Sequence, residues 1–247
     1  MRHAGTLTFV ASQTELAKPL VEQVRSTRST IALKIGMAAS GLIFVLFVLL
    51  HMYGNLKAFG GEHAFNTYAH HLRTFGEPML PYGGLLWIVR AVLIVSLVVH
   101  VATAATLWKR ARRARRVRYA VKKNTGATWA SLLMRWGGVT LLLFIIWHLL
   151  NFTIGKINVT GGPTDNPYRL LVDTFDTWWL TLIYLVAMAM LGAHLHHGVW
   201  SACQTLGLTS NARARRRAKA FGLVLALVIT IGFSLVPIFT VFGVISY

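Results

Sequence analysis

The sequence predicts an all-α integral membrane protein with five transmembrane helices. Mean hydropathy is +0.57 and 55% of the 247 residues are hydrophobic, which is outside the range of ordinary soluble domains. Five apolar runs are each long enough to cross a bilayer as a helix. The 25 Lys and Arg residues, set against 7 Asp and Glu, fall mainly between these runs. This distribution favours basic loops at a membrane over a nucleic-acid-binding surface.

The first helix is expected at about residues 33–54, after a polar N-terminal segment, 1–30, that we expect in the cytoplasm. From Lys34 onward the chain has about twenty residues without a charge, enough to span the bilayer. His51 lies near the end of this run. An ionisable ring inside a membrane helix is costly, so it marks a candidate functional site. Because residues 1–30 lack the apolar core of a signal peptide, the first helix is expected to direct its own insertion.

We expect one transmembrane domain over residues 31–247. It holds four more expected helices, at about 84–108, 131–154, 177–203 and 220–246. The second, third and fourth contain histidines, whereas the fifth has neither a histidine nor a charge. The loop 54–83 is too long for a tight turn. Its aromatic residues and histidines predict a short interfacial helix from Glu62 to Thr74, closed by Gly76 and Pro78.

Two strongly basic loops set the expected orientation. KRARRARRVRYAVKKN follows the second helix and NARARRRAKA follows the fourth. Basic loops stay in the cytoplasm, so we expect the N-terminus inside and the C-terminus outside. The single cysteine, Cys203, excludes an intrachain disulfide and an all-cysteine metal site.

Spacing predicts the depth of the histidines. His51 and His148 lie about seventeen residues into helices that enter from the inside, and His100 and His194 lie equally far into helices that enter from the outside. At roughly 1.5 Å per residue each is ~25 Å from its entry point. His51 and His148 therefore share an outer level, and His100 and His194 share an inner level, about 15 Å apart in a core of ~30 Å.

Two histidines at one level on different helices can bind one iron from opposite sides, which is the arrangement of bis-histidine haem b. A single intramembrane histidine is more often an interhelical hydrogen-bond partner, but four at two matched levels favour two stacked haem b groups inside a four-helix bundle. A non-haem metal or a proton relay is disfavoured because no carboxylate lies within the helices. On the fourth helix, depth favours His194 over His197, while His196 points elsewhere. His196 and His197 are left to cap carbonyls or to contact a propionate.

Several motifs carry a family resemblance: FVLLHMYGNL, VVHVATA, IIWHLL, the H-x-x-x-G-x-W-S of His194 to Ser201, and the K-x-x-M-A-x-S-G that begins at Lys34. Their order and spacing resemble the di-haem, b558-type cytochrome b that anchors succinate dehydrogenases and fumarate reductases. The resemblance extends from about residue 29 to 246. It implies that His51 and His148 bind the distal haem and that His100 and His194 bind the proximal one. Gly198 matches the glycine of the last family motif, which again selects His194.

The same resemblance implies a respiratory complex II, of the tricarboxylic acid cycle, in a bacterial inner (plasma) membrane. A flavoprotein subunit oxidises succinate, and an iron–sulfur subunit docks on the cytoplasmic face. Electrons then pass through two haem b groups to a quinone, expected to be menaquinone. A homo-oligomer of the whole complex is compatible with it. This chain offers no acid or base for succinate chemistry. The basic loop 109–123 either binds anionic lipid or contacts the iron–sulfur subunit.

Two other classes remain as alternatives. One is the di-haem cytochrome b anchor of a hydrogenase or formate dehydrogenase, and the other is a haem-free membrane transporter or structural protein. The quinone headgroup has two candidate positions, one at each end of the bundle. The outer candidates are Tyr53, Asn55, Glu62 and His63, and the inner ones are Ser29, Lys34 and Arg135.

Overall fold

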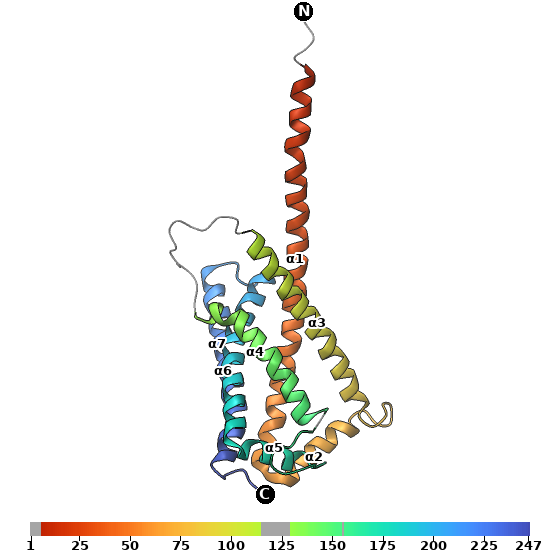
Figure 1. Ribbon diagram of the computed structural model, residues 1–247, viewed down its shortest axis with the longest axis vertical. Helices are drawn as coiled ribbons and strands as arrows, with labels where there is room; N and C mark the ends of the chain where they lie inside the picture. The colour runs from red at the N-terminus through yellow and green to blue at the C-terminus, as the bar shows by residue number, and fades with distance from the viewer. Residues whose placement is uncertain (1–5, 115–128, 155) are drawn as a thin grey trace, which may run out of the picture.

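The computed structural model describes residues 6–114, 129–154 and 156–247, and over these residues the protein is built from helices and connecting turns (Figure 1). The helices are α1 (Thr6–Leu56), a 3-10 turn η1 (Lys57–Gly60), α2 (Gly61–Thr74), α3 (Gly84–Arg113), α4 (Trp129–Phe152), α5 (Pro167–Asp176), α6 (Trp178–Thr205) and α7 (Ala212–Val241). The all-α prediction is confirmed for this part of the chain.

Five of these helices are long and apolar enough to cross a membrane, as the sequence predicted: α1 from Thr30 onward, α3, α4 from Met134, α6 and α7. The bounds of α3, α4 and α6 lie within a few residues of the expected ones. α2 confirms the short helix predicted after the first span. The first helix differs in extent, because α1 already begins at Thr6 and its first half projects beyond the other helices (Figure 1).

The fifth span is displaced from its predicted bounds, 220–246. α7 begins at Ala212, where the Asn211 side chain caps the helix by accepting the backbone N–H of Ala214 at 2.8 Å. The alanines and arginines that follow are strong helix formers, so the basic stretch is helical and not a loop. The helix ends at Val241, and Gly243 follows with a φ of 71°, a conformation that glycine adopts without strain.

α5 lies between the third and fourth predicted spans, 131–154 and 177–203, where the sequence predicted no helix. Asn166 caps it by accepting the N–H groups of Tyr168 and Arg169, and Pro167 occupies its first turn. Nearly all of α5 is buried, in a cluster that includes Tyr168, Leu171, Val172 and Phe175 of α5, Tyr184 of α6 and Val236 of α7. Residues 170–175 are buried in succession, so the helix is enclosed on all sides by its neighbours.

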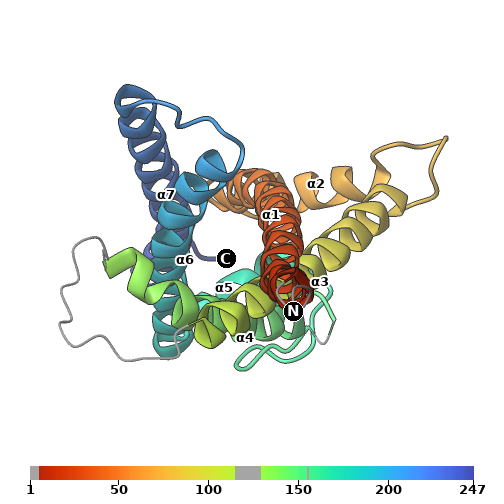
Figure 2. The ribbon, with the colours of Figure 1, turned by 90° about the horizontal axis from the view of Figure 1, so that it is seen from above.

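The long helices pack in a defined pattern. α6 and α7 pair closely, with Gly192 of α6 against Thr230 of α7, and α1 packs against α3, α6 and α7. α4 packs against α6. Within the described ranges, α1 and α4 share at most marginal backbone contact, and so do α3 and α6. Figure 2 shows α3 leaving the bundle beside α1 and extending away from α6 and α7.

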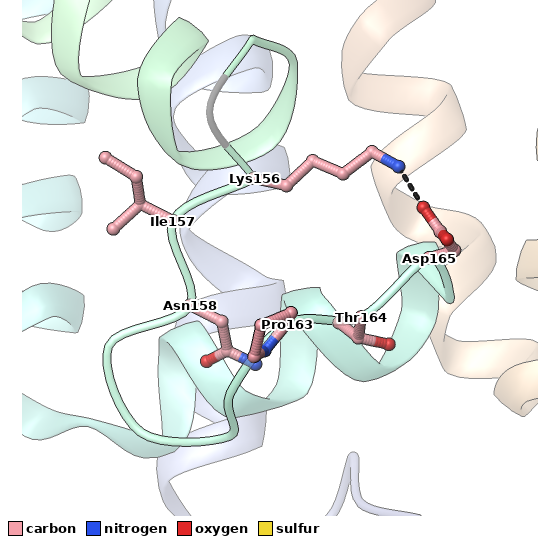
Figure 3. Close-up of a pocket in the computed structure, with 6 residues that line it drawn as sticks. All are labelled: Lys156, Ile157, Asn158, Pro163, Thr164 and Asp165. Carbon is pink, nitrogen blue, oxygen red and sulfur yellow. Dashed lines mark hydrogen bonds and ion pairs between the residues drawn. The ribbon is translucent and has the colours of Figure 1, made fainter.

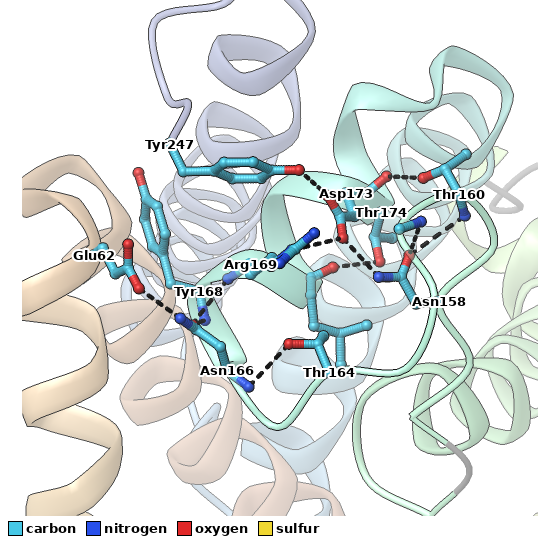
Figure 4. A network of polar contacts seen from close by, with 12 residues as sticks. Glu62, Asn158, Thr160, Thr164, Asn166, Tyr168, Arg169, Asp173, Thr174 and Tyr247 are labelled. Carbon is cyan, nitrogen blue, oxygen red and sulfur yellow. Dashed lines mark hydrogen bonds and ion pairs between the residues drawn. The ribbon is translucent and has the colours of Figure 1, made fainter.

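A polar cap closes the end of the bundle opposite the N-terminus; it comprises α2, residues 156–166, α5 and Tyr247 (Figures 1 and 4). Asn66 of α2 donates to the Asn166 side chain at 2.9 Å and accepts the Tyr168 N–H at 3.2 Å. The buried Asp173 carboxylate accepts from the Tyr247 hydroxyl at 2.6 Å. Donating this hydrogen bond raises the pKa of Tyr247. The cap therefore ties the last residue of the chain to α5.

Candidate functional site

The histidine pair predicted at the outer level joins α1 and α4. The ring centres of His51 and His148 are 5.7 Å apart, and their planes meet at 80°. Each ring stacks on a phenylalanine one helical turn earlier, Phe47 at 5.2 Å and Phe144 at 5.8 Å between centres. Residues four apart share one face of a helix, so this spacing places each ring against an apolar neighbour.

The pair predicted at the inner level joins α3 and α6. The ring centres of His100 and His194 are 6.2 Å apart with an interplanar angle of 55°. Glycines of the two remaining helices lie beside these rings. A Cβ at Gly41 of α1 would be 3.4 Å from Cε1 of His100, and one at Gly138 of α4 would be 3.8 Å from Cε1 of His194. Small residues at these positions keep side chains away from the rings.

Hydrogen bonding differs within each pair. The Nδ1 atom of His148 lies 3.4 Å from the Tyr184 hydroxyl, and that of His100 lies 3.2 Å from the Ser40 hydroxyl. The Nδ1 atom of His194 is buried without a hydrogen-bond partner among the described residues. One ring of each pair is thus held by a hydroxyl group from a neighbouring helix.

The geometry of both pairs fits a group bound through two axial imidazoles. A metal–imidazole bond is about 2 Å long and a ring centre lies roughly 1 Å behind its nitrogen, so two rings flanking one ion have centres about 6 Å apart. The two observed separations, 5.7 and 6.2 Å, are close to this value. All four histidines keep some accessible surface. Over the described part of the chain, no group of three or more His, Cys, Asp or Glu could hold a metal ion.

The structure brings together the same pairs that depth predicted, while their role as haem ligands stays a prediction. His196 and His197 also lie on α6, and both are partly buried. Neither ring contacts another histidine ring in the residues that the structure describes, although the His196 carbonyl lies close to Gly222 of α7. Their geometry therefore gives no second imidazole to pair with.

The residues proposed for a quinone headgroup are spread over both ends. Asn55 donates to the His51 carbonyl at 2.9 Å, and Glu62 accepts from the Asn166 side chain. At the other end, Arg135 lies over the ring of Trp108, 5.8 Å from its centre, and Lys34 is exposed. The Ser29 side chain is outside the described residues. The two ends are not distinguished by these contacts.

A surface cavity of about 450 Å³ lies in the polar cap (Figure 3). It is lined by the loop from Lys156 to Asn158 and by Pro163, Thr164 and Asp165. Lys156 and Asp165 form an ion pair across it, and the hydrogen bond from Lys156 lowers the pKa of Asp165. None of the four paired histidines lines this cavity, so it is separate from the histidine site.

Three residues beside the histidines were not predicted from the sequence as part of the site: Tyr184, Asn151 and Ser40. Asn151 is completely buried at the end of α4 and accepts the Tyr184 hydroxyl at 2.8 Å. An asparagine three residues after a membrane histidine is the one signal that pointed to this position, because a buried amide needs partners.

Comparison with known protein families agrees with this architecture. The model of the succinate dehydrogenase/fumarate reductase transmembrane subunit family matches residues 109–233, just over half of the chain. The match includes α4 and α6, and with them His148 and His194. His51 and His100 precede it.

One similar relative is the succinate dehydrogenase cytochrome b558 subunit of Bacillus subtilis (strain 168). It is 23% identical over 176 residues, which cover 69% of this chain and 77% of the relative. No solved structure matches. The family match, together with five helices of membrane-spanning length, identifies this multi-pass membrane protein as belonging to the succinate dehydrogenase/fumarate reductase transmembrane subunit family.

Proposed function

We propose that this chain is the di-haem electron-transfer anchor of a succinate dehydrogenase, which passes electrons from an iron–sulfur subunit to menaquinone. The family identifies the chain as a membrane subunit of a succinate:quinone oxidoreductase. The observation that carries the finer proposal is the pairing of four membrane histidines into two sets with ring centres 5.7 and 6.2 Å apart. The cytochrome b558 name of the relative supports haem as the bound group.

In this proposal the chain's own residues hold and orient the cofactors. His51 and His148 bind the outer haem iron, and His100 and His194 bind the inner one. Haem b would supply one-electron redox centres, one held by each histidine pair. Phe47 and Phe144 keep the outer pair in apolar surroundings. Low polarity and the identity of the axial ligands both tune the potential of such a centre.

Charge distribution supports the proposed orientation. Basic side chains at the end of α3 and the start of α7 lie at one end of the bundle, whereas the acidic residues from Glu62 onward lie at the other, in or near the polar cap (Figure 1). Basic segments stay on the cytoplasmic side. The flavoprotein and iron–sulfur subunits would therefore dock at the basic end, next to the His100–His194 pair, and the polar cap would face outward.

A reduced-minus-oxidised absorption spectrum of the purified complex tests the haem part of the proposal. We expect b-type bands from two haems per chain. The absence of such a band would leave a haem-free transporter or structural protein as the function.

Deletion of the gene tests the reaction. We expect membranes to lose succinate:quinone activity while hydrogenase and formate dehydrogenase activities persist. Loss of either of those activities, with succinate oxidation retained, would favour the anchor of another quinone-linked oxidoreductase.

A further inference from the structure

Two hydroxyl groups face histidines across helix–helix contacts. Tyr184 of α6 lies 3.4 Å from the Nδ1 atom of His148 on α4, and Ser40 of α1 lies 3.2 Å from the Nδ1 atom of His100 on α3. Tyr184 and Ser40 are both buried, at 5% and 4% exposure. A hydroxyl can donate or accept, so the direction of each bond depends on where its hydrogen goes.

The hydrogen of Tyr184 goes to Asn151. The distance from the Tyr184 hydroxyl to the Asn151 Oδ1 atom is 2.8 Å, which is shorter than its distance to His148. The orientation of the Asn151 amide is fixed from the other side, because its Nδ2 atom donates to the Ile157 carbonyl at 2.7 Å. A carbonyl can only accept, so the amide oxygen must face Tyr184.

A second contact of Asn151 agrees with this orientation. Its Nδ2 atom also lies 3.3 Å from the hydroxyl of Thr174 on α5. Thr174 gives its own hydrogen to the Leu170 carbonyl at 2.7 Å and is left as an acceptor. The chain of donors therefore runs from Tyr184 to Asn151 and on to α5. Only lone pairs of the Tyr184 oxygen remain for His148.

The hydrogen bond between Ser40 and His100 runs in the same direction, from the ring to the hydroxyl oxygen. The Ser40 hydrogen goes to backbone carbonyls one turn earlier on α1, that of Gly36 at 2.8 Å and that of Met37 at 3.2 Å. The lone pairs of the serine oxygen are left for His100. For both histidines, then, the Nδ1 atom is the donor and carries the hydrogen. A neutral imidazole with hydrogen on Nδ1 has its free lone pair on Nε2, the form that binds a metal through Nε2.

We propose that Tyr184 and Ser40 are positioning residues, which fix the tautomer and ring orientation of His148 and His100 so that their Nε2 atoms are free to bind iron. This inference rests on the proposed function. It also gives each pair an asymmetry: among the described residues, the rings of His51 and His194 accept or donate no corresponding hydrogen bond. Each pair would thus hold its iron with one imidazole that donates to a hydroxyl group and one that does not.

The hydrogen bond has a measurable electronic effect. An imidazole that donates from Nδ1 is a stronger base at Nε2, and a more basic ligand favours the ferric state. Removal of the hydroxyl should raise the midpoint potential of the haem beside it. A tenfold change in the preference for ferric over ferrous iron corresponds to about 59 mV for a one-electron couple.

The test uses the intact complex, titrated in its native membrane and followed by absorption and by the EPR signals of the ferric haems. Tyr184→Phe should raise the midpoint potential of the outer haem by up to about 59 mV, which corresponds to a tenfold change in the ferric–ferrous preference. The midpoint potential of the inner haem should stay unchanged. Ser40→Ala should do the reverse. Tyr168→Phe and Ser234→Ala are matched controls, because their hydroxyls donate to the Ser246 and Thr230 carbonyls and contact no histidine.

The second haem in each variant is the internal check on folding. A changed midpoint potential, or a partial loss of haem, that is confined to the expected haem supports the proposal. Unchanged potentials and EPR signals in both variants would overturn it, and so would equal changes at both haems, which mean a general packing effect. If the parent complex has no b-type haem, the proposed function fails first, and this result is distinct from a failure of the two hydroxyl variants alone.

Discussion

The side chains around the outer histidines show how this bundle tolerates polar rings. The His51 ring stacks on Phe47, and its centre lies 5.7 Å from the ring centre of Phe233. The His148 ring is surrounded by the rings of Phe144, Phe152 and Tyr184. An uncompensated polar group in an apolar medium is costly. A binding role for the Nε2 atoms would give these rings the partner that their apolar surroundings lack.

Alanine substitutions test the proposed haem ligands one pair at a time. His100→Ala or His194→Ala should remove the proposed inner haem, because either change deletes one of its two imidazole ligands, and should leave the outer haem bound. His51→Ala or His148→Ala should have the opposite effect. Haem content per chain and a redox titration of the purified complex measure this. Loss of the outer haem in the His100→Ala variant would show that the pairs are assigned the wrong way round.

His196 and His197 provide the matched controls on the same helix. Neither ring lies against another histidine in the described structure, so His196→Ala and His197→Ala should each leave two haems bound. The haem-to-protein ratio is the measurement. If His196→Ala loses a haem and His194→Ala does not, the ligand on α6 has been chosen incorrectly.

The histidine pairs could be predicted from the sequence because a helix has a fixed rise, so that position along the chain gives depth. The hydroxyl groups beside them could not. Ser40 and His100 are sixty residues apart, and Tyr184 and His148 are thirty-six apart. Their contacts depend on the rotation of packed helices about their axes, for which hydropathy gives no signal when all sides are apolar.

At the scale of the elements, α5 shows what hydropathy missed. Residues 158–166 contain Gly, Pro, Asn and Asp, which are typical of turns, and the ten residues of α5 are too few to span a membrane. The Asn-Pro pair at its start was the available signal. The arginines at the start of α7 likewise form a helix where their charge predicted a loop, because arginine and alanine both have high helix propensity.

The cap of α5 has a predicted energetic value. Asn166→Ala removes the side chain that accepts from Tyr168 and Arg169, and should destabilise the complex by about 0.5–2 kcal/mol. Asn166→Ser keeps a capping oxygen but loses the contact with Glu62, so it should recover most of this loss. Thermal denaturation of the purified complex measures both. Equal destabilisation by the two variants would show that the bond to α2 matters more than the cap.

The proposed orientation can be tested with single cysteines. In a Cys203→Ser background, Asp165→Cys in the polar cap should react with a membrane-impermeant thiol reagent applied to intact cells. Arg216→Cys at the start of α7 should react only after the membrane is opened. Both positions are exposed, so accessibility alone does not explain a difference. Ready labelling of Arg216→Cys in intact cells would reverse the orientation, and with it the inner and outer assignments.

For the whole molecule, the separation of charge is the main feature. Arg213, Arg215, Arg216 and Arg217 are exposed at the start of α7, near the basic end of α3, and the second half of the basic loop, from residue 115, lies outside the described residues. Trp108 and Trp200 carry basic side chains over their rings at this end. Such an end suits an acidic partner surface or anionic lipid headgroups.

Partner docking should depend on these arginines collectively. Replacing the four of α7 with glutamine should make the iron–sulfur and flavoprotein subunits dissociate at lower salt, because opposite charges steer and align the subunits. Single replacements should be nearly silent, since an exposed ion pair contributes roughly 0–1 kcal/mol. Subunit retention on a salt gradient measures this, with orientation checked by the cysteine labels. A correctly inserted quadruple variant that keeps its partners over the parent's salt range would assign this end to lipid.

In the described ranges α1 and α4 share only marginal backbone contact, as do α3 and α6, so haem binding as proposed would link assembly to cofactor supply. Of the long helices, α3 packs mainly on α1, and α4 packs mainly on α6. Each histidine pair joins one such side helix to the opposite half of the bundle. A ligand that binds only the folded state stabilises it by mass action. A cell short of haem should therefore accumulate chains whose α3 and α4 are open to membrane proteases, so the amount of anchor, and of respiratory complex, would follow haem synthesis without a dedicated regulator.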